Sequence, residues 1–271
     1  MSRSYGEYLK VPELLGLQQL LSSPTEHDET LFIVVHQVYE LWFKEVLHEL
    51  DTACRRLDGD EVLEASRLLR RVVEIQRVLV AQVRVLETMR PQDFLGFRYR
   101  LNPASGFQSI QFREIEFALG LKDTGVLAHL VCSPEETDRL QARLGAPDLA
   151  QAVDDLLVRR GFPRDTPPPA VDAPGREEDW RLQALVRIYE GPEDYPDLLA
   201  LCEVLIEIDE GLSLWRAHHV QMVERMIGIK RGTGGSDGVA YLRGTLPKRA
   251  FPDLWRVRTH LGQEPASPGI S

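Results

Sequence analysis

Apolar residues recur at steps of three and four positions along most of the chain, and this period constrains the fold more than any other feature. Alternating runs of Val, Ile and Thr, which would indicate half-buried strands, are scarce. We therefore predict an almost all-α protein. Because 43% of the 271 residues are hydrophobic, the chain has enough apolar material for a sizeable core, and we expect residues 1–271 to form a single domain.

Breaks in the helical period give the bounds of three long helices. The first is predicted from about His27 to Arg56, and the second from about Asp60 to Met89, where Arg90-Pro91 closes it. The last is predicted from about Tyr195 to Ile229. Such lengths indicate a bundle with long central helices.

The segments between these helices give weaker signals. We expect an irregular stretch over 91–106, a helix from near Phe107 to Gly120, and shorter helices between Ser133 and Arg160. Five prolines exclude a helix interior over 161–178, which we interpret as a surface connection. The tail from Gln263 to Ser271 is expected to fray.

Charge and cysteine content exclude several classes of partner. With 42 acidic against 32 basic residues, the net charge of −10 has the wrong sign for general attraction to nucleic acid. Three widely spaced cysteines form neither a disulfide framework nor a zinc ribbon, which favours a reducing, cytoplasmic compartment. No secretory signal and no apolar run of about 18 residues is found, so we expect a soluble protein without a membrane partner.

One histidine lies on the apolar stripe of the last long helix. His219 belongs to this stripe, whereas its neighbour His218 lies about 100° round the helix. A histidine on a buried seam is either hydrogen-bonded within the core or bound to a metal, and the period alone leaves both open. The stripe consists of Leu198, Leu201, Leu205, Ile208, Leu212, Trp215, His219, Met222 and Met226.

A second histidine occupies the first long helix, which is apolar nearly all round and therefore belongs in the centre of the domain. His36 faces the side that also holds Phe43 and Leu47. An imidazole beside aromatic rings suits a pocket over a flat cofactor, although a structural histidine would give the same pattern. Glu45 and His48 have the spacing of a di-iron ligand pair, but no second Glu-x-x-His accompanies them, so we interpret them as an incidental surface pair.

Two further segments are candidates for ligand binding. Arg98, flanked by Phe94 and Phe97, could clamp a carboxylate or could be solvated or paired with an acid. The Gly-rich stretch 228–238 lacks the ending of a phosphate-binding loop. It is either a loop that closes over a ligand through the Thr233 hydroxyl or a flexible connection.

Taken together, these segments resemble the tryptophan 2,3-dioxygenase family. The similar motifs occur in the family's order and span nearly the whole chain. They are Tyr5-Gly-Glu-Tyr8-Leu9, His27 to Lys44, Phe97-Arg98, Ala104 to Arg113, Trp215-Arg-Ala-His-His219 and Gly232 to Gly238.

The resemblance implies a helical bundle that holds heme b, ferrous in the active state. It implies an oxidoreductase that inserts both atoms of O2 across the C2–C3 bond of the indole ring of L-tryptophan, giving N-formylkynurenine. Ferrous iron needs one neutral imidazole and an open sixth position to bind O2. Related heme oxygenases that act on modified tryptophans, and a heme protein that binds tryptophan without turnover, are the alternatives.

The resemblance also implies roles for individual residues. His219 would be the axial iron ligand, and the catalytic His36 would accept a hydrogen bond from the indole N–H. The remaining implied residues bind substrate, and three of them cross into a neighbouring subunit in a homotetramer through an exchanged N-terminal segment. The substrate-binding residues are Phe32, Phe94, Arg98, Ser105 and Thr233, with Tyr5, Tyr8 and Leu9 as the crossing residues.

Overall fold

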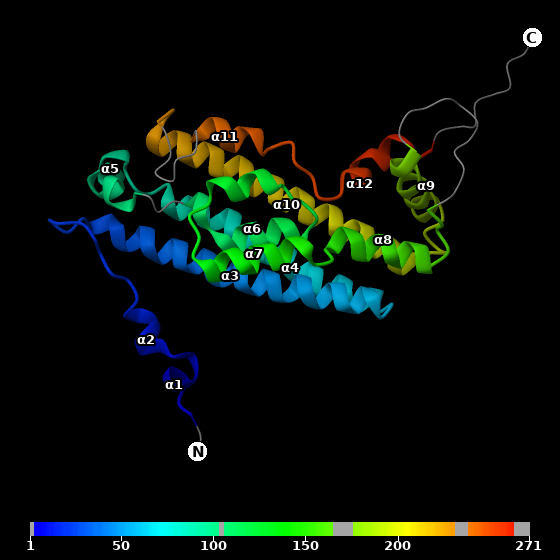
Figure 1. The fold of residues 1–271 in the computed structure, drawn as a ribbon, viewed down its shortest axis with the longest axis horizontal. Helices are drawn as coiled ribbons and strands as arrows, with labels where there is room; N and C mark the ends of the chain where they lie inside the picture. The colour runs from blue at the N-terminus through cyan, green and yellow to red at the C-terminus, as the bar shows by residue number, and fades with distance from the viewer. Residues whose placement is uncertain (1–2, 103–105, 165–175, 231–237, 263–271) are drawn as a thin grey trace, which may run out of the picture.

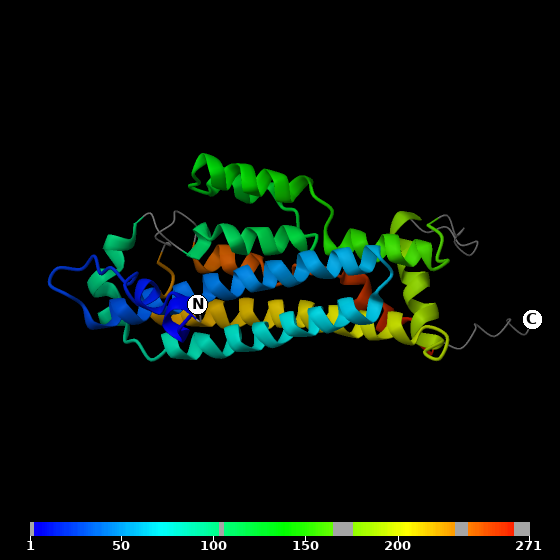
Figure 2. The same cartoon turned by 90° about the horizontal axis from the view of Figure 1, so that it is seen from below.

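Three long helices lie side by side and form the body of the molecule (Figures 1 and 2). The computed structural model describes residues 3–102, 106–164, 176–230 and 238–262, and every regular element in these ranges is helical. The long helices are α3 (His27–Asp58), α4 (Val62–Leu86) and α10 (Pro196–Ile227). Both the all-α prediction and the three long helices are confirmed, with bounds that differ by at most three residues.

The connection between α3 and α4 shows why these helices end where they do. Acidic Asp28 and Glu29 occupy the first turn of α3, and Arg55 and Arg56 occupy its last turn, so the charges complement the helix dipole at both ends. Asp60 then adopts a left-handed conformation with φ of 64°, which aspartate tolerates better than most residues. The chain reverses within a few residues, and α4 packs antiparallel to α3.

The core lies between these helices, where α4 packs against both α3 and α10. Leu50 and Leu57 of α3, Leu69 of α4, and Leu201 and Ile208 of α10 are almost completely buried. Across the described part of the chain, no helix has both the length and the apolar character needed to cross a bilayer.

A second layer covers one side of α3. Helices α6 (Ile110–Ala118) and α8 (Leu149–Arg159) pack on α3, and α7 (Pro134–Gly145) packs on the outside of α6 (Figure 2). The helices predicted between Ser133 and Arg160 are therefore present. Between α7 and α6 lies a small separate hydrophobic core, which is formed by Ile110, Phe117, Val126 and Leu140.

The prediction that 91–106 is irregular was wrong for its first eight residues. They form α5 (Pro91–Arg98), which starts with proline in the first turn, where its missing N–H costs nothing. Gly96 inside α5 has a packing role, since a Cβ there would lie 2.7 Å from Oε1 of Glu26. The glycine therefore leaves space for the Glu26 carboxylate where α5 lies against the start of α3. The helix expected from Phe107 begins at Ile110, where Ser109 caps it.

Helix α9 (Arg176–Glu190) and the short helices α11 (Val239–Gly244) and α12 (Pro252–Arg256) were not predicted. Helix α9 begins inside the stretch interpreted as a Pro-rich connection, and it packs near α12 at one end of the bundle (Figure 1). Helix α11 packs along the last turns of α10. Helices of five or six residues carry too little periodic signal to be recognised.

The N-terminal segment leaves the bundle. Helices α1 (Tyr5–Leu9) and α2 (Val11–Leu15) project away from the three long helices (Figure 1). The segment is anchored just before α3, where the buried Glu29 carboxylate accepts hydrogen bonds from the backbone N–H groups of Leu21 at 2.7 Å and Ser22 at 3.0 Å.

A buried aspartate on α10 fastens the C-terminal segment. The Asp209 carboxylate accepts hydrogen bonds from the backbone N–H groups of Ala250 (2.8 Å) and Phe251 (3.0 Å) and from Nε1 of Trp255 (3.2 Å). Replacing Asp209 by alanine leaves these donors without their acceptor, so we expect unfolding in urea to show a loss of about 2–4 kcal/mol. Glu210→Ala, a change at the exposed neighbour, is the matched control. Equal stability of the two variants would contradict this account.

Candidate active site

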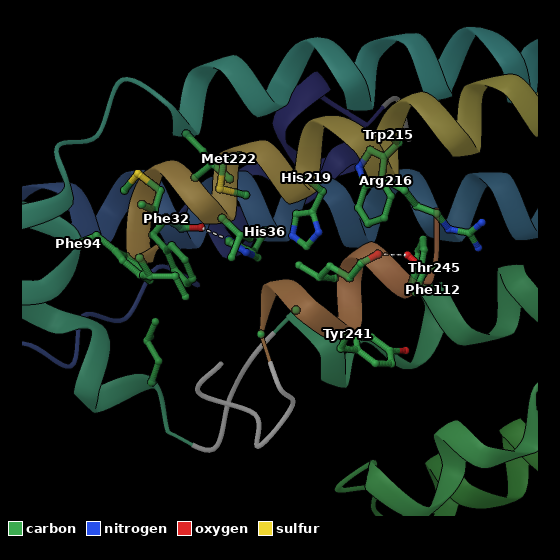
Figure 3. Close-up of a pocket in the computed structure, with 18 of the residues that line it drawn as sticks. Phe32, His36, Phe94, Phe112, Trp215, Arg216, His219, Met222, Tyr241 and Thr245 are labelled. Carbon is green, nitrogen blue, oxygen red and sulfur yellow. Dashed lines mark hydrogen bonds between the residues drawn. The ribbon is translucent and has the colours of Figure 1, made fainter. Parts of the chain in front are cut away.

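A largely apolar cavity opens at the end of the bundle where α5 and α11 meet α3, α6 and α10 (Figure 3). It encloses about 1280 Å³ between its side chains, the open mouth included. The apolar wall consists of Phe32, Leu86, Met89, Phe94, Leu101, Phe112, Trp215, Met222, Val223, Met226, Ile227 and Leu242. Five of the residues singled out in the sequence line this one cavity, namely Phe32, His36, Phe94, Arg98 and His219.

The protonation of the His36 ring is fixed by its own helix. Its Nδ1 lies 2.7 Å from the carbonyl oxygen of Phe32, one turn earlier, so Nδ1 carries the proton and donates it. Burial lowers the pKa of His36, while this hydrogen bond and the Glu40 carboxylate oppose the shift. The neutral ring therefore has Nε2 as its acceptor, and that atom is available to a donor in the cavity.

His219 is also a neutral imidazole. Burial and, to a smaller extent, the nearby His36 lower the pKa of His219 to about 4. His219 lines the cavity and His218 does not. The Trp215 ring stacks on it almost in parallel, with centroids 5.1 Å apart and an interplanar angle of 8°. Two neutral imidazoles from α3 and α10 thus share one cavity (Figure 3).

An aromatic cluster forms the wall nearest α5. The ring of Phe32 lies 4.0 Å from that of His36, 5.8 Å from that of Phe94 and 5.6 Å from that of Phe97, measured between centroids. Phe97 is completely buried behind this wall, whereas Phe94 lines the cavity. The two phenylalanines of α5 therefore attach Arg98, at the end of the same helix, to the start of α3.

Arg98 is the half-buried cation at this end of the cavity. It is the last residue of α5, which packs on α3. Its guanidinium offers a planar pair of donors, which matches the geometry of a carboxylate. The cavity thus combines a flat aromatic wall with a cationic end.

A buried ion cluster on the opposite wall was not identified from the sequence. Glu116 of α6 accepts from Arg113 at 2.5 Å and from Arg216 of α10 at 2.9 Å, and Arg216 also donates to the carbonyl oxygen of Lys248 at 2.9 Å. All three side chains are buried and line the cavity. The i, i+3 spacing of Arg113 and Glu116 was a local signal, but the pairing with Arg216 depends on the fold.

The other predicted site residues lie elsewhere. Ser105 and Thr233 fall outside the described residues, although Gly106 and Gly238, which follow those segments, line the cavity. The three residues of the N-terminal motif are exposed on α1, away from the cavity of their own chain. Their exposed fractions are 78% for Tyr5, 72% for Tyr8 and 45% for Leu9.

The Glu45 and His48 pair also lies outside the cavity, with His48 exposed on α3. In the part of the chain that the structure describes, no group of three or more His, Cys, Asp or Glu side chains could hold a bare metal ion. The cavity instead suits a metal whose other ligands are supplied by a prosthetic group. A neutral imidazole at His219 and apolar walls fit a flat macrocycle whose iron takes one ligand from the protein.

Comparisons with known proteins agree with this geometry. The sequence model of a family described as "Tryptophan 2,3-dioxygenase" matches residues 1–132 and 180–261. A protein of that name from Nocardioides sp. is 48% identical to this chain over 264 residues, which cover 95% of this chain and 94% of the relative. Those from Herpetosiphon aurantiacus and Bacillus cereus are 46% and 43% identical, each over 95% of this chain and over 98% and 92% of their own lengths.

Proposed function

Because the chain belongs to the tryptophan 2,3-dioxygenase family, we propose that the cavity between α3, α5, α6 and α10 is where it carries out that family's reaction. The chain is an oxidoreductase that cleaves the C2–C3 bond of the indole ring of L-tryptophan with O2 and gives N-formylkynurenine. The observation that carries the assignment to this cavity is the convergence of His36, Arg98 and His219 on one apolar space.

Heme b is the proposed cofactor, with His219 as the one protein ligand of its iron. When bound in the ferrous state, heme supplies the iron that activates O2. The low pKa of His219 supports this role, since an imidazole that stays neutral keeps a lone pair for a metal at all physiological pH values. The apolar walls exclude water from the reacting atoms.

The substrate would lie between the aromatic wall and the cationic end of the cavity. Phe32 and Phe94 would contact the indole ring, and Arg98 would bind the α-carboxylate. Ser105 and Thr233 are proposed to complete the site near the cofactor and the amino-acid end of the substrate. Tyr5, Tyr8 and Leu9 are proposed to reach the active site of a neighbouring subunit in a homotetramer. Their exposure on a segment that leaves the bundle supports this arrangement.

The cytoplasm is the proposed compartment. Cys54, Cys132 and Cys202 are free thiols in the structure, as is usual in a reducing environment.

His36 is proposed to accept a hydrogen bond from the indole N–H at Nε2, because Nδ1 is already committed to the Phe32 carbonyl. In His36→Ala the indole N–H is buried without an acceptor, so we expect kcat/KM for L-tryptophan to fall about 10- to 100-fold. Steady-state assays of product formation measure this change.

The matched substrate for this test is 1-methyl-L-tryptophan, which has no indole N–H. For this substrate the His36→Ala change is expected to cost much less than for L-tryptophan. An equal loss with both substrates would mean that the hydrogen bond is not the role of His36.

The activity is tested with the ferrous holoenzyme, L-tryptophan and air-saturated buffer, by following the appearance of N-formylkynurenine. Product formed in step with tryptophan consumption supports the assignment. A heme protein that binds L-tryptophan without converting it would overturn it.

A further inference from the structure

The His219 ring stacks on the Trp215 ring. We propose that Trp215 is a positioning residue that fixes the rotation of the His219 imidazole and hence the orientation of the iron ligand. This inference rests on the proposed ligation of heme by His219. Trp215 would act only through that ring, so its role differs from the catalytic role proposed for His36.

The first observation is the geometry of the two rings. Trp215 and His219 are four residues apart on α10, a spacing that places side chains on the same face of a helix. Their centroids are 5.1 Å apart and their planes differ by 8°, which is a parallel stack. Rotating the imidazole about its Cβ–Cγ bond would break this contact, so the stack selects one orientation.

The second observation is what else holds the two histidine rings. His36 is oriented by the hydrogen bond from Nδ1 to the Phe32 carbonyl. Figure 3 shows no hydrogen bond from the His219 ring to the residues drawn around it, and none is found within the described ranges, although a metal-bound histidine usually donates its other N–H to an oxygen atom. Stacking on Trp215 is therefore the contact that can define the orientation of the His219 ring.

The third observation is that aromatic rings of two other helices pack on Trp215 itself. Its ring contacts Phe112 of α6 at a centroid distance of 4.8 Å and Tyr39 of α3 at 6.5 Å. The Tyr39 hydroxyl in turn donates to the carbonyl oxygen of Leu79 on α4 at 2.7 Å. Contacts with α3, α4 and α6 thus restrict Trp215, and through the stack they restrict the His219 side chain on α10.

The indole N–H contributes little to this arrangement. Nε1 of Trp215 is buried near the Tyr39 hydroxyl, yet in the described structure it makes no hydrogen bond of ordinary geometry. A buried N–H donor without an acceptor is energetically unfavourable. The contact with His219 is therefore explained by the flat face of the indole ring and not by its Nε1 atom. Phenylalanine at position 215 would keep an aromatic face toward His219 and would lose no hydrogen bond.

Three variants of the holoenzyme separate these contributions. Trp215→Phe keeps an aromatic face on His219, and Trp215→Leu removes it. Phe43→Leu is the matched control, because Phe43 packs on Tyr39 and Phe112 in the same aromatic group without contacting His219. The readouts are the iron–imidazole stretching band of the ferrous protein in resonance Raman spectra and the rate of heme transfer to excess apomyoglobin.

We expect one narrow iron–imidazole band at the same position in the wild type, Trp215→Phe and Phe43→Leu. In Trp215→Leu the band is expected to shift or broaden, and heme loss to become about 2- to 10-fold faster. If Trp215→Leu does not fold, as judged by circular dichroism, Trp215→Met takes its place with the same expectation.

An unchanged band and heme-loss rate in Trp215→Leu would overturn the proposal, as would identical changes in Trp215→Phe and Trp215→Leu. Failure of the proposed heme ligation by His219, on which this inference rests, has a different signature. In that case the wild-type protein itself would show no iron–imidazole band.

Discussion

His219→Ala is expected to abolish stable heme binding, so that the purified variant carries heme only at background level. His219 is the proposed iron ligand, and alanine at this position has no atom that can bind iron. The His36 ring on the same cavity is held by its hydrogen bond to the Phe32 carbonyl and is proposed to bind substrate. The heme-to-protein ratio, measured as the pyridine hemochrome after expression with adequate iron, checks this prediction.

The adjacent histidine provides the control. His218 lies outside the cavity, so His218→Ala should retain heme and the wild-type spectrum. Addition of free imidazole to His219→Ala is expected to restore part of the heme binding, because the truncation leaves space where the ring was. A His219→Ala protein that keeps its heme and an unchanged ferrous spectrum would contradict the assignment.

Arg98→Ala is expected to lower kcat/KM for L-tryptophan about 100-fold or more, mainly through a higher KM. The proposed clamp pairs a guanidinium with the substrate carboxylate in a cavity with largely apolar walls, and truncating one partner of such a pair is costly. Steady-state kinetics over a wide range of tryptophan concentration measure the effect.

A neighbouring arginine and a second substrate make this test specific. Arg100 donates to the Ser23 carbonyl at 3.2 Å and does not line the cavity, so Arg100→Ala should leave KM nearly unchanged. Tryptamine has no carboxylate, and the wild type and Arg98→Ala should bind it about equally. If Arg98→Ala weakened the binding of tryptamine as much as that of tryptophan, Arg98 would have a role other than carboxylate recognition.

The long helices could be predicted because their apolar periods are long and their ends carry clear signals. Helix α5 could not, since Pro91 and Gly96 are typical of loops when read locally. The proline occupies the first turn, and the glycine leaves space for the side chain of Glu26, which lies 70 positions earlier. That second reason is a tertiary contact, so no local pattern contains it.

The candidate site also has features that could be predicted from the sequence and features that could not. The period of α10 placed His219 on the buried stripe, and the structure puts it on the cavity wall while His218 stays outside. The sequence left open whether His219 is structural or a metal ligand. The answer depends on the cavity that it shares with His36 of α3. Because α3 and α10 are brought together in the core through α4, this arrangement is a property of the fold. The Glu116–Arg216 pair joins residues 100 positions apart, so it too was beyond local patterns.

Oxygen labelling shows directly whether both atoms of O2 enter L-tryptophan. The ferrous holoenzyme is given L-tryptophan under ¹⁸O₂, and the product is analysed at once by mass spectrometry. We expect N-formylkynurenine with two heavy oxygen atoms. A product with a single heavy oxygen, or unchanged tryptophan with bound heme, would contradict this expectation.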